Sequence, residues 1–305
     1  MATTSGTEVP ARAAPALRRA INALPVVRDL PWRRTRDPWR ILISELCCQQ
    51  TQVVRAVEAY ERCCQRFPTP SSCADAPRSD VLEAWRGLGY YRRARSLHEA
   101  SAVIVDRHGG AVPNDLVALL ALPGVGPYTA RAVLAFAFER DVAIVDTNVA
   151  RVLARAVANR PLGVREAQRI ADSLVEPGRG WHHNQALLDV GAMHCTAVPS
   201  CDGCPLLASC RWRREGPSSA DPAPRTAGAP RRQASFEGSD RQGRGRVLAA
   251  ALHGPVPHGS IAEVAGWPLD PARARRVVDE MVDEGLLRRA RGSVRAEDRP
   301  ARGTG

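Results

Sequence analysis

Four cysteines near residue 200 have the types and spacing to bind a metal. Cys195, Cys201, Cys204 and Cys210 form the pattern Cys-x5-Cys-x2-Cys-x5-Cys, and Pro205 follows the third. Thiolates in such a run bind either zinc or a [4Fe-4S] cluster, and the spacing leaves both open. The pattern predicts a metal-ligand set, whereas the other five cysteines, spaced among apolar residues, are interpreted as small core side chains.

Two carboxyl groups form a second candidate for chemistry. Glu45 lies on the apolar stripe of an expected helix that starts after Asp37 and ends near Cys48. Asp146 follows the apolar run 142–145, where helix capping is the alternative role. A carboxyl in apolar surroundings has a raised pKa, so two carboxyls in different environments could cleave an N-glycosidic bond. One acid would protonate the departing base, and the other would stabilise the oxocarbenium-like sugar.

A glycine-containing turn is the third candidate. The stretch Leu122-Pro-Gly-Val-Gly-Pro-Tyr128 lies between helical patterns at 116–121 and 129–138. Gly124 and Gly126 allow a tight turn around Val125, and the next helix directs backbone N-H groups towards a phosphate. This is a helix-hairpin-helix signature, with an ordinary turn between two helices as the alternative. Such phosphate contacts position DNA without reading its sequence.

Composition limits the class of protein that positions these groups. The chain has 305 residues, 44% of them hydrophobic and 25% charged, which predicts a globular protein of two domains. A net charge of +11 favours polyanionic partners, with nucleic acid as the first candidate. No apolar run has the length of a membrane helix, so we expect a cytoplasmic, nucleoid-associated protein that does not contact a membrane.

All 43 basic residues other than histidine are arginine, and lysine is absent from the sequence. A GC-rich genome is sufficient to explain this composition. Arginine keeps its proton at ordinary pH and cannot act as an amine nucleophile. A mechanism that needs a side-chain Schiff base is therefore excluded.

The sequence predicts structural parts that follow one another along the chain. Helical periodicity without strand-like alternation predicts an all-α main domain. The C-terminal part shows three short helical patterns and a hairpin near Gly292, an order that resembles a winged helix. Residues 211–305 contain 18 arginines and 12 acidic residues, a net charge of +6. The predicted parts are a disordered tail at 1–15, the main domain at 16–213, a linker at 214–241 and a small basic module at 242–305.

These motifs together resemble the MutY-type adenine DNA glycosylases. That family belongs to the helix-hairpin-helix, iron-sulfur superfamily that also contains endonuclease III. The resemblance runs from about Leu30 to Cys210. Its most specific stretches are Leu30-Pro-Trp-Arg33, Ser44-Glu45, Gln49-Gln-Thr-Gln-Val53, Gly87-Leu-Gly-Tyr-Tyr91, Leu122 to Tyr128, Val145-Asp-Thr-Asn-Val149, Asn184-Gln-Ala186 and Asp189-Val-Gly-Ala192.

The resemblance implies roles for individual residues. Glu45 would protonate the adenine and Asp146 would be the essential carboxylate, with Tyr128 and Asn148 beside the reacting sugar. Tyr128 stands where endonuclease III-type enzymes carry a catalytic lysine. Gln50 and Tyr90 match residues that wedge into the duplex, and the adenine pocket would contain Trp32, Arg33, Gln185 and Asp189. Gly124, Val125 and Gly126 would contact the DNA phosphate, and Cys195, Cys201, Cys204 and Cys210 would hold a [4Fe-4S] cluster.

The sequence departs from the family pattern at several positions. The first cysteine gap is five residues where six is usual, Cys48 replaces a bulky apolar residue, and Thr147 replaces a common glycine. The largest departure is the C-terminus, where a short helical module stands in place of the β-rich, Nudix-like domain that recognises 8-oxoguanine.

The expected fold is therefore an all-α, two-lobed helix-hairpin-helix glycosylase fold with a cluster loop at 195–210, followed by a winged-helix-like module. The expected function is monofunctional removal of adenine mispaired with 8-oxoguanine or guanine in double-stranded DNA, by a monomeric enzyme. One alternative is an endonuclease III-like glycosylase and lyase for oxidised pyrimidines, against which the absence of lysine counts. A non-catalytic iron-sulfur DNA-binding regulator is the other, and it would need neither Glu45 nor Asp146.

Overall fold

The chain forms two compact units, each built from two separate stretches of sequence. The computed structural model describes residues 13–216, 220–226 and 235–298. One unit comprises residues 1–33 and 130–232, and the other comprises 34–129 and 233–305. The parts predicted from composition follow the chain in order, whereas each compact unit is discontinuous. The boundaries predicted after residues 15, 213 and 241 therefore remain predictions.

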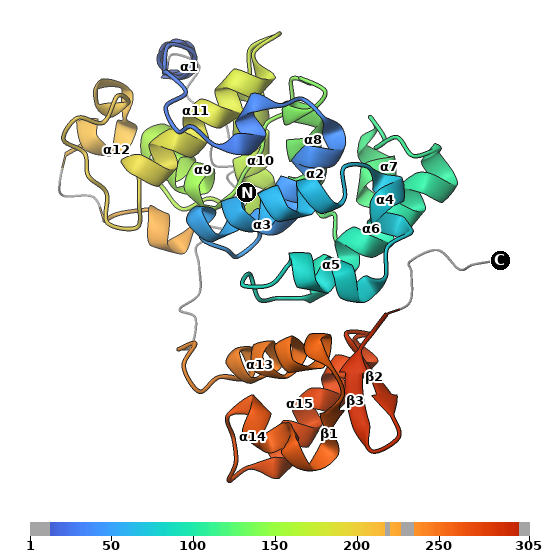
Figure 1. Ribbon diagram of the computed structural model, residues 1–305. Helices are drawn as coiled ribbons and strands as arrows, with labels where there is room; N and C mark the ends of the chain where they lie inside the picture. The colour runs from blue at the N-terminus through green and yellow to red at the C-terminus, as the bar shows by residue number, and fades with distance from the viewer. Residues whose placement is uncertain (1–12, 217–219, 227–234, 299–305) are drawn as a thin grey trace, which may run out of the picture. The chain divides into compact units, whose positions relative to one another are not determined.

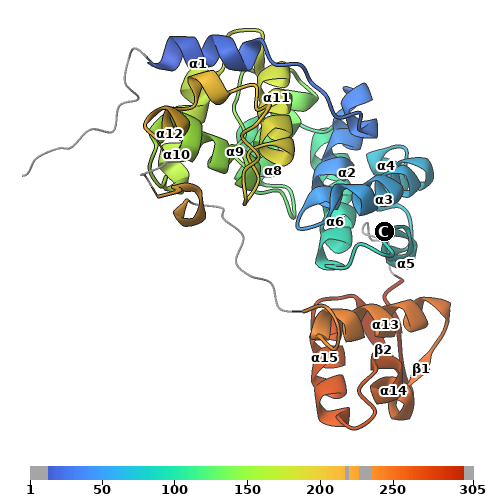
Figure 2. The ribbon, with the colours of Figure 1, turned by 90° about the vertical axis from the view of Figure 1, so that its left-hand side faces the viewer.

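All regular secondary structure in the described part of the first unit is helical. Its helices α1, α9, α10 and α11 lie together in both views (Figures 1 and 2). They bury a shared apolar core that includes Leu17, Ile21, Val149, Leu174 and Leu187. The helices and helical turns of this unit are α1 (Ala13–Asn22), η1 (Pro31–Arg34, whose last residue lies in the second unit), α9 (Thr147–Val152), η2 (Leu153–Ala158), α10 (Val164–Leu174), α11 (Gly180–Met193), η3 (Leu207–Ser209), α12 (Arg211–Arg214) and η4 (Ala223–Arg225).

The second unit begins with a set of packed helices. Asp37 starts α2 as predicted, because its carboxylate accepts hydrogen bonds from the N-H groups of Trp39 at 2.9 Å and Arg40 at 3.3 Å. Leu42 and Leu46 of α2 are fully buried. The helices are α2 (Pro38–Cys48), α3 (Val53–Arg66), α4 (Pro70–Ala74), α5 (Arg78–Ala84), α6 (Arg92–His108), α7 (Leu116–Leu120) and α8 (Pro127–Phe136), the last of which continues into the first unit.

The C-terminal module belongs to this same unit and contains all the strands of the described chain. Its three longest elements are helices, and a hairpin with the two-residue turn Arg291-Gly292 follows them, as predicted. The antiparallel sheet has the order β1-β3-β2. This is the order of elements in a winged helix: α13 (Asp240–His253), β1 (Val256–Pro257), η5 (His258–Ser260), α14 (Ile261–Ala265), α15 (Pro271–Asp283), β2 (Leu287–Ala290) and β3 (Ser293–Ala296).

The helices of the described residues differ in length and hydropathy from a membrane-spanning helix. None of them is both long enough and apolar enough to cross a bilayer.

Candidate active site

Asp146 begins helix α9 and holds a defined carboxylate geometry. Its Oδ1 accepts a hydrogen bond from the Val149 N-H at 2.7 Å, and its Oδ2 accepts one from the Asn148 side-chain amide at 2.7 Å. Burial of the carboxyl group raises the pKa of Asp146, and these hydrogen bonds act in the opposite direction. Asp146 is thus a helix cap, as one of its two predicted roles requires, and its carboxyl group is also buried.

A chain of hydrogen bonds leads from Asp146 to the cysteine loop. The Asn148 side-chain oxygen accepts a hydrogen bond from the Arg151 guanidinium at 2.7 Å. Arg151 also donates to the carbonyl oxygens of Cys195 at 2.8 Å and Gly191 at 3.0 Å. Arg151 therefore orients Asn148, and through it Asp146, from the start of the cysteine loop. Arg151 was not identified from the sequence, although its position one turn after Asn148 was a signal.

Helix α11 holds the backbone on both sides of Asp146. The Asn184 side chain accepts from the Ile144 N-H at 2.9 Å and donates to the carbonyl oxygens of Val142 and Gly180, both at 2.8 Å. One turn further along, a Cβ on Gly191 would lie 2.7 Å from the Asn148 Cβ. Glycine at this position lets α11 approach α9 closely enough for these contacts.

Two of the predicted adenine-pocket residues, Arg33 and Asp189, form a second polar cluster in the first unit. Asp189 on α11 accepts two hydrogen bonds from the Arg33 guanidinium, at 2.7 and 2.9 Å, and one from the Val27 N-H at 2.8 Å. Burial would raise the pKa of Asp189, but its hydrogen bonds, above all those from Arg33, outweigh burial and lower the pKa to about 2. Trp32 beside Arg33 and Gln185 on α11 are buried as well.

Glu45 and Tyr128 belong to the second compact unit. Glu45 lies on α2 and is 8% exposed, with the fully buried Leu42 and Leu46 on the same helix. Tyr128 lies in the first turn of α8 and is partly exposed. The predicted catalytic residues are thus divided between the two units, because Asp146 and Asn148 lie in the first.

The glycine turn joins α7 and α8 as the helix-hairpin-helix signature predicted. Gly124 has a φ of +76°, and a Cβ there would lie 2.5 Å from the Cβ of Ser96. The N-H of Val125 donates to the carbonyl oxygen of Leu122 at 3.1 Å, and its side chain is buried. Gln49 donates from its side chain to the Gly124 carbonyl oxygen at 3.4 Å, which ties the hairpin to the end of α2.

The predicted wedge residues share an unusual backbone conformation. Gln50 has a φ of +52° and Tyr90 has a φ of +46°, both in the left-handed region that residues other than glycine rarely adopt. Such conformations persist where the surrounding structure imposes them, and they concentrate at functional sites.

Arg93 imposes that conformation on both loops, and it was not identified from the sequence. Its guanidinium donates to the carbonyl oxygens of Leu46 and Cys47, both at 3.0 Å, and to the Thr51 hydroxyl at 2.9 Å. It also donates to the Gly89 carbonyl oxygen at 3.2 Å. The buried cation therefore joins the loop after α2 to the loop before α6.

The four cysteines of the C-terminal run gather around one small cavity of about 30 Å³. Their sulfur atoms form no disulfide. Within the described residues, no group of three or more histidine, cysteine and acidic side chains is arranged to hold a metal ion.

Arg155 fixes the start of this loop. It donates to the Cys195 sulfur at 3.3 Å and to the Thr196 carbonyl oxygen at 2.7 Å, and it forms an ion pair with Asp221 at 2.6 Å. The side chain of Arg155 is 1% exposed. Asp221 lies in the segment predicted as linker, so part of that segment is bound to the first unit.

The chain is similar in sequence and fold to known DNA repair proteins. Residues 43–177 match the family described as HhH-GPD superfamily base excision DNA repair protein. Among solved structures, a thermostable thymine-DNA glycosylase aligns with a TM-score of 0.62 and 28% identity, over 68% of this chain and 100% of that one. A trapped endonuclease III-DNA covalent intermediate aligns with a TM-score of 0.57 and 25% identity, over 70% and 99%. Fold and sequence thus define a helix-hairpin-helix base-excision glycosylase.

The relatives give the family within that class. Adenine DNA glycosylase from Mycobacterium tuberculosis is 40% identical over 86% of this chain and 86% of its own length. The protein of the same name from Mycolicibacterium smegmatis is 41% identical, over 85% and 88%. The human one is 39% identical over 61% of this chain and 37% of its own length. The chain belongs to the adenine DNA glycosylase family and is a hydrolase of N-glycosyl bonds.

Proposed function

We propose that this enzyme removes adenine mispaired with 8-oxoguanine or guanine in duplex DNA, by hydrolysis and without cutting the strand. The observation that carries the proposal is the buried Asp146 carboxyl, oriented by Val149 and Asn148 in a chain that has no lysine. A carboxylate in this position can stabilise a cationic sugar, and without a side-chain amine no imine with the sugar can form there. Membership of the adenine DNA glycosylase family supports adenine as the base.

The proposed chemistry divides acid and electrostatic roles between two carboxyls. Glu45 donates a proton to the adenine as the bond from the sugar C1′ to the base breaks with its electron pair going to the base. Asp146, as the carboxylate, stabilises the positive charge that develops on the sugar until water adds to C1′, and the proton that this water loses restores the Glu45 carboxyl group. Glu45 is 8% exposed and lies on α2 with the fully buried Leu42 and Leu46.

The remaining predicted residues position the substrate in this proposal. Asn148 holds the Asp146 carboxylate, and Tyr128 lies beside the sugar. Trp32, Arg33 and Gln185 contact the flipped adenine. Asp189 acts through Arg33, whose guanidinium donates two hydrogen bonds to its carboxylate. Gly124, Val125 and Gly126 approach the phosphate backbone, and Gln50 and Tyr90 enter the duplex next to the mispair.

Cys195, Cys201, Cys204 and Cys210 are proposed to hold a [4Fe-4S] cluster. Four thiols around one cavity supply the donor set that such a cluster needs. The donor from Arg155 to the Cys195 sulfur suits a thiolate ligand, because a cation there stabilises its negative charge. When bound, the cluster would cross-link the cysteine loop. The Cys195 carbonyl oxygen at the start of this loop accepts a hydrogen bond from Arg151. The enzyme is further proposed to act as a monomer in the cytoplasm, on the nucleoid.

One experiment separates the proposal from its rivals. The purified protein is incubated with duplexes that contain adenine opposite 8-oxoguanine, adenine opposite guanine, adenine opposite cytosine, or thymine glycol. Base release is measured separately from strand nicking. The proposal requires adenine release from the first two duplexes and an intact strand until alkali is added. Release of thymine glycol with nicking would support the lyase alternative, and binding without any release would support the regulator.

A further inference from the structure

A cavity in the second compact unit lies beside the proposed wedge residue Tyr90. Its volume is about 670 Å³, and three segments form it: 50–55, 86–91 and the start of the C-terminal module at 236–249. Its lining combines aromatic rings with cations, namely Tyr90, Tyr91, Phe236, Arg55, Arg86, Arg241 and Arg246. Aromatic faces stack on nucleobases and guanidinium groups pair with phosphates, so this lining suits a nucleotide.

Tyr90 is held by a residue of the C-terminal module. The Arg241 guanidinium donates a hydrogen bond to the Tyr90 hydroxyl at 3.0 Å and lies 5.8 Å from the centre of its ring. Arg93 lies 5.5 Å from the same ring centre, and Arg241 lies 5.9 Å from the ring of Phe236. The left-handed backbone of Tyr90 is thus accompanied by two cation-π contacts, one of them from the module.

Further contacts fix the module within this unit. Arg78 donates to the Gly285 carbonyl oxygen at 3.1 Å, and Arg95 donates to the Glu284 carbonyl oxygen. The side chain of Glu284 forms an ion pair with Arg244 on α13. Arg241 therefore reaches Tyr90 from a module that is anchored at a second place.

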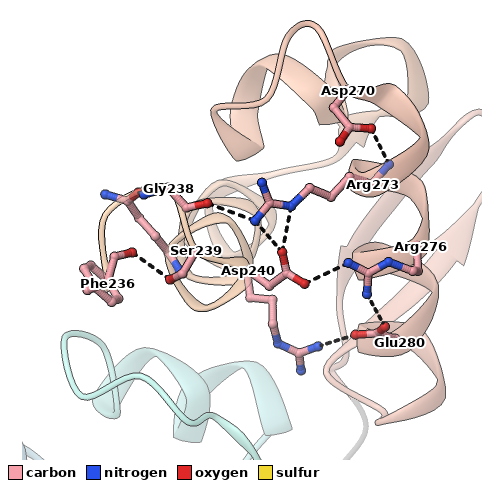
Figure 3. Close-up of polar contacts among 10 residues, drawn as sticks. Phe236, Gly238, Ser239, Asp240, Asp270, Arg273, Arg276 and Glu280 are labelled. Carbon is pink, nitrogen blue, oxygen red and sulfur yellow. Dashed lines mark hydrogen bonds and ion pairs between the residues drawn. The ribbon is translucent and has the colours of Figure 1, made fainter. Parts of the chain in front are cut away.

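The helix that corresponds to the DNA-reading helix of a winged helix is neutralised by acidic residues. Figure 3 shows Asp240 bound to both Arg273 and Arg276 of α15, and Arg276 bound in turn to Glu280. Residues 235–298 contain 10 arginines and 10 acidic residues, so this stretch has no net charge. The module is therefore poorly suited to bind DNA through α15, and its Arg241 side contributes to the cavity instead.

We infer that Phe236 and Arg241 are positioning residues that complete, with Tyr90, a pocket for one nucleotide of the DNA strand that Tyr90 enters. This inference rests on the proposed function, because entry of Tyr90 into a duplex is part of it. The base stacks on the aromatic rings, and its phosphate pairs with the arginines of the rim. A module with the fold of a DNA reader would thus serve as one wall of the pocket beside the mispair.

The test uses full-length protein and a duplex that resists cleavage. The adenine opposite guanine is replaced by its 2′-fluoro analogue, whose fluorine disfavours a cationic sugar, and 2-aminopurine stands next to that guanine. Wild-type protein should raise the 2-aminopurine fluorescence, because the entering ring unstacks it. Arg241→Gln and Phe236→Ala should each reduce this rise and slow adenine release from the natural mispair about fivefold, the size expected for one cation-π contact. Arg275→Gln, an exposed arginine of α15, is the matched control and should behave as wild type.

A double-mutant cycle distinguishes positioning from a general loss of stability. In a Tyr90→Ala background, Arg241→Gln should add no further loss of fluorescence or rate. Thermal unfolding of each variant checks that the module is folded, and Arg241→Lys, which keeps the charge without the planar group, should lie between wild type and Arg241→Gln.

Three results would overturn the inference: equal behaviour of Arg241→Gln and Arg275→Gln, additive losses in the cycle, or saturable binding of free dGMP at this site with a DNA response that does not depend on Arg241. Failure of the proposed function would look different. A wild type that releases no adenine but shows the Arg241-dependent fluorescence rise would refute that function and still support the pocket.

Discussion

At the scale of single residues, Asp146 is a helix cap to which we also assign a proposed chemical role. Its Oδ1 caps α9 through the Val149 N-H, while its Oδ2 is held by Asn148. Asparagine caps helices about as well as aspartate, so a change from one to the other tests the chemistry with little effect on the helix.

Glu45→Gln and Asp146→Asn should each slow single-turnover adenine release by at least about a hundredfold, because each removes an interaction that strengthens in the transition state. Mispair affinity should stay near that of wild type, since the phosphate contacts remain. The free energy of unfolding of Asp146→Asn should fall by about 1 kcal/mol, because the helix cap is kept but the hydrogen bond from the Asn148 amide to Oδ2 is lost. If Asp146→Asn kept near wild-type rates, the residue would be a helix cap only.

The pH dependence of the rate provides a second test of Asp146. Burial raises the pKa of this carboxyl above the ordinary value of 3.8, and the reaction needs its ionised form. Single-turnover release should therefore decline on the acid side at a higher pH than an ordinary aspartate would cause. Asn148→Ala, which removes a hydrogen bond to the carboxylate, should shift this decline to still higher pH. A decline at the same pH in Asn148→Ala would show that another group controls it.

Tyr128→Lys should introduce lyase chemistry into an enzyme that we propose to be monofunctional. The wild type should form no borohydride-trapped DNA adduct above background, because no lysine is present in the chain. The variant should give trapped adduct and weak nicking if residue 128 lies beside the sugar. Efficient trapping by the wild type, persisting when the N-terminal amine is blocked, would contradict this placement.

At the scale of secondary structure, α11 is the element on which the first unit depends. Asn184, Asp189 and Gly191 on this helix contact the segment before Asp146, the segment 27–33 and α9. Two of these contacts give predictions for stability.

Gly191→Ala should destabilise the protein by about 2 kcal/mol, because its new methyl group would overlap Asn148. Adenine release should fall as well, since Asn148 must move away from Asp146. The matched control is Gly259→Ala on η5, where no atom lies within 4 Å of the added carbon and a small gain in stability is expected. Urea unfolding and single-turnover rates measure both effects, and equal behaviour of the two variants would refute the close approach of α11 and α9.

Asp189 should make stability depend on pH in the acid range. Its pKa in the folded protein is about 2, below the ordinary 3.8, so its stabilisation of about 2 kcal/mol is fully present above pH 4 and is lost as the pH falls towards 2. Asp189→Asn should lose about 3 kcal/mol at neutral pH, because the buried Arg33 guanidinium would lose the carboxylate charge that balances its own. The difference from wild type should shrink when unfolding is measured at pH 3, and a constant difference would contradict the assignment.

At the scale of the whole molecule, the composition indicated a basic C-terminal module. The positive charge of the C-terminal part is distributed differently along the chain. Residues 211–305 carry +6, but residues 211–234 contribute 6 arginines against 2 acidic residues, while 235–305 contribute 12 against 10. The excess lies mainly before the module.

A chain that ends at Ala234 should therefore lose little of the salt dependence of DNA binding. The slope of the logarithm of affinity against the logarithm of salt should fall by no more than about 2, since the removed part carries a net +2. Mispair discrimination should fall more clearly, because Arg241 and Phe236 are lost. A fall in slope of 5 or 6 would show that the module binds the DNA backbone directly.

The sequence by itself determined the features that depend on neighbours along the chain. The Asp37 and Asp146 caps, the turn at Gly124 and the hairpin at Gly292 all follow from residue types a few positions apart. The main helical fold and the family also follow from such local motifs.

Only the tertiary structure decided which distant groups meet. Arg93 is one arginine among 43, and nothing local separates it from exposed ones, whereas its burial against particular carbonyl oxygens does. Asp189 pairs with Arg33 across 156 positions, and Arg241 reaches Tyr90 across 151. Charge counted along the sequence likewise cannot show that Asp240 neutralises α15. Such pairings are set by how helices pack, because a hydrogen bond depends on distance in space and periodicity reports only distance along the chain.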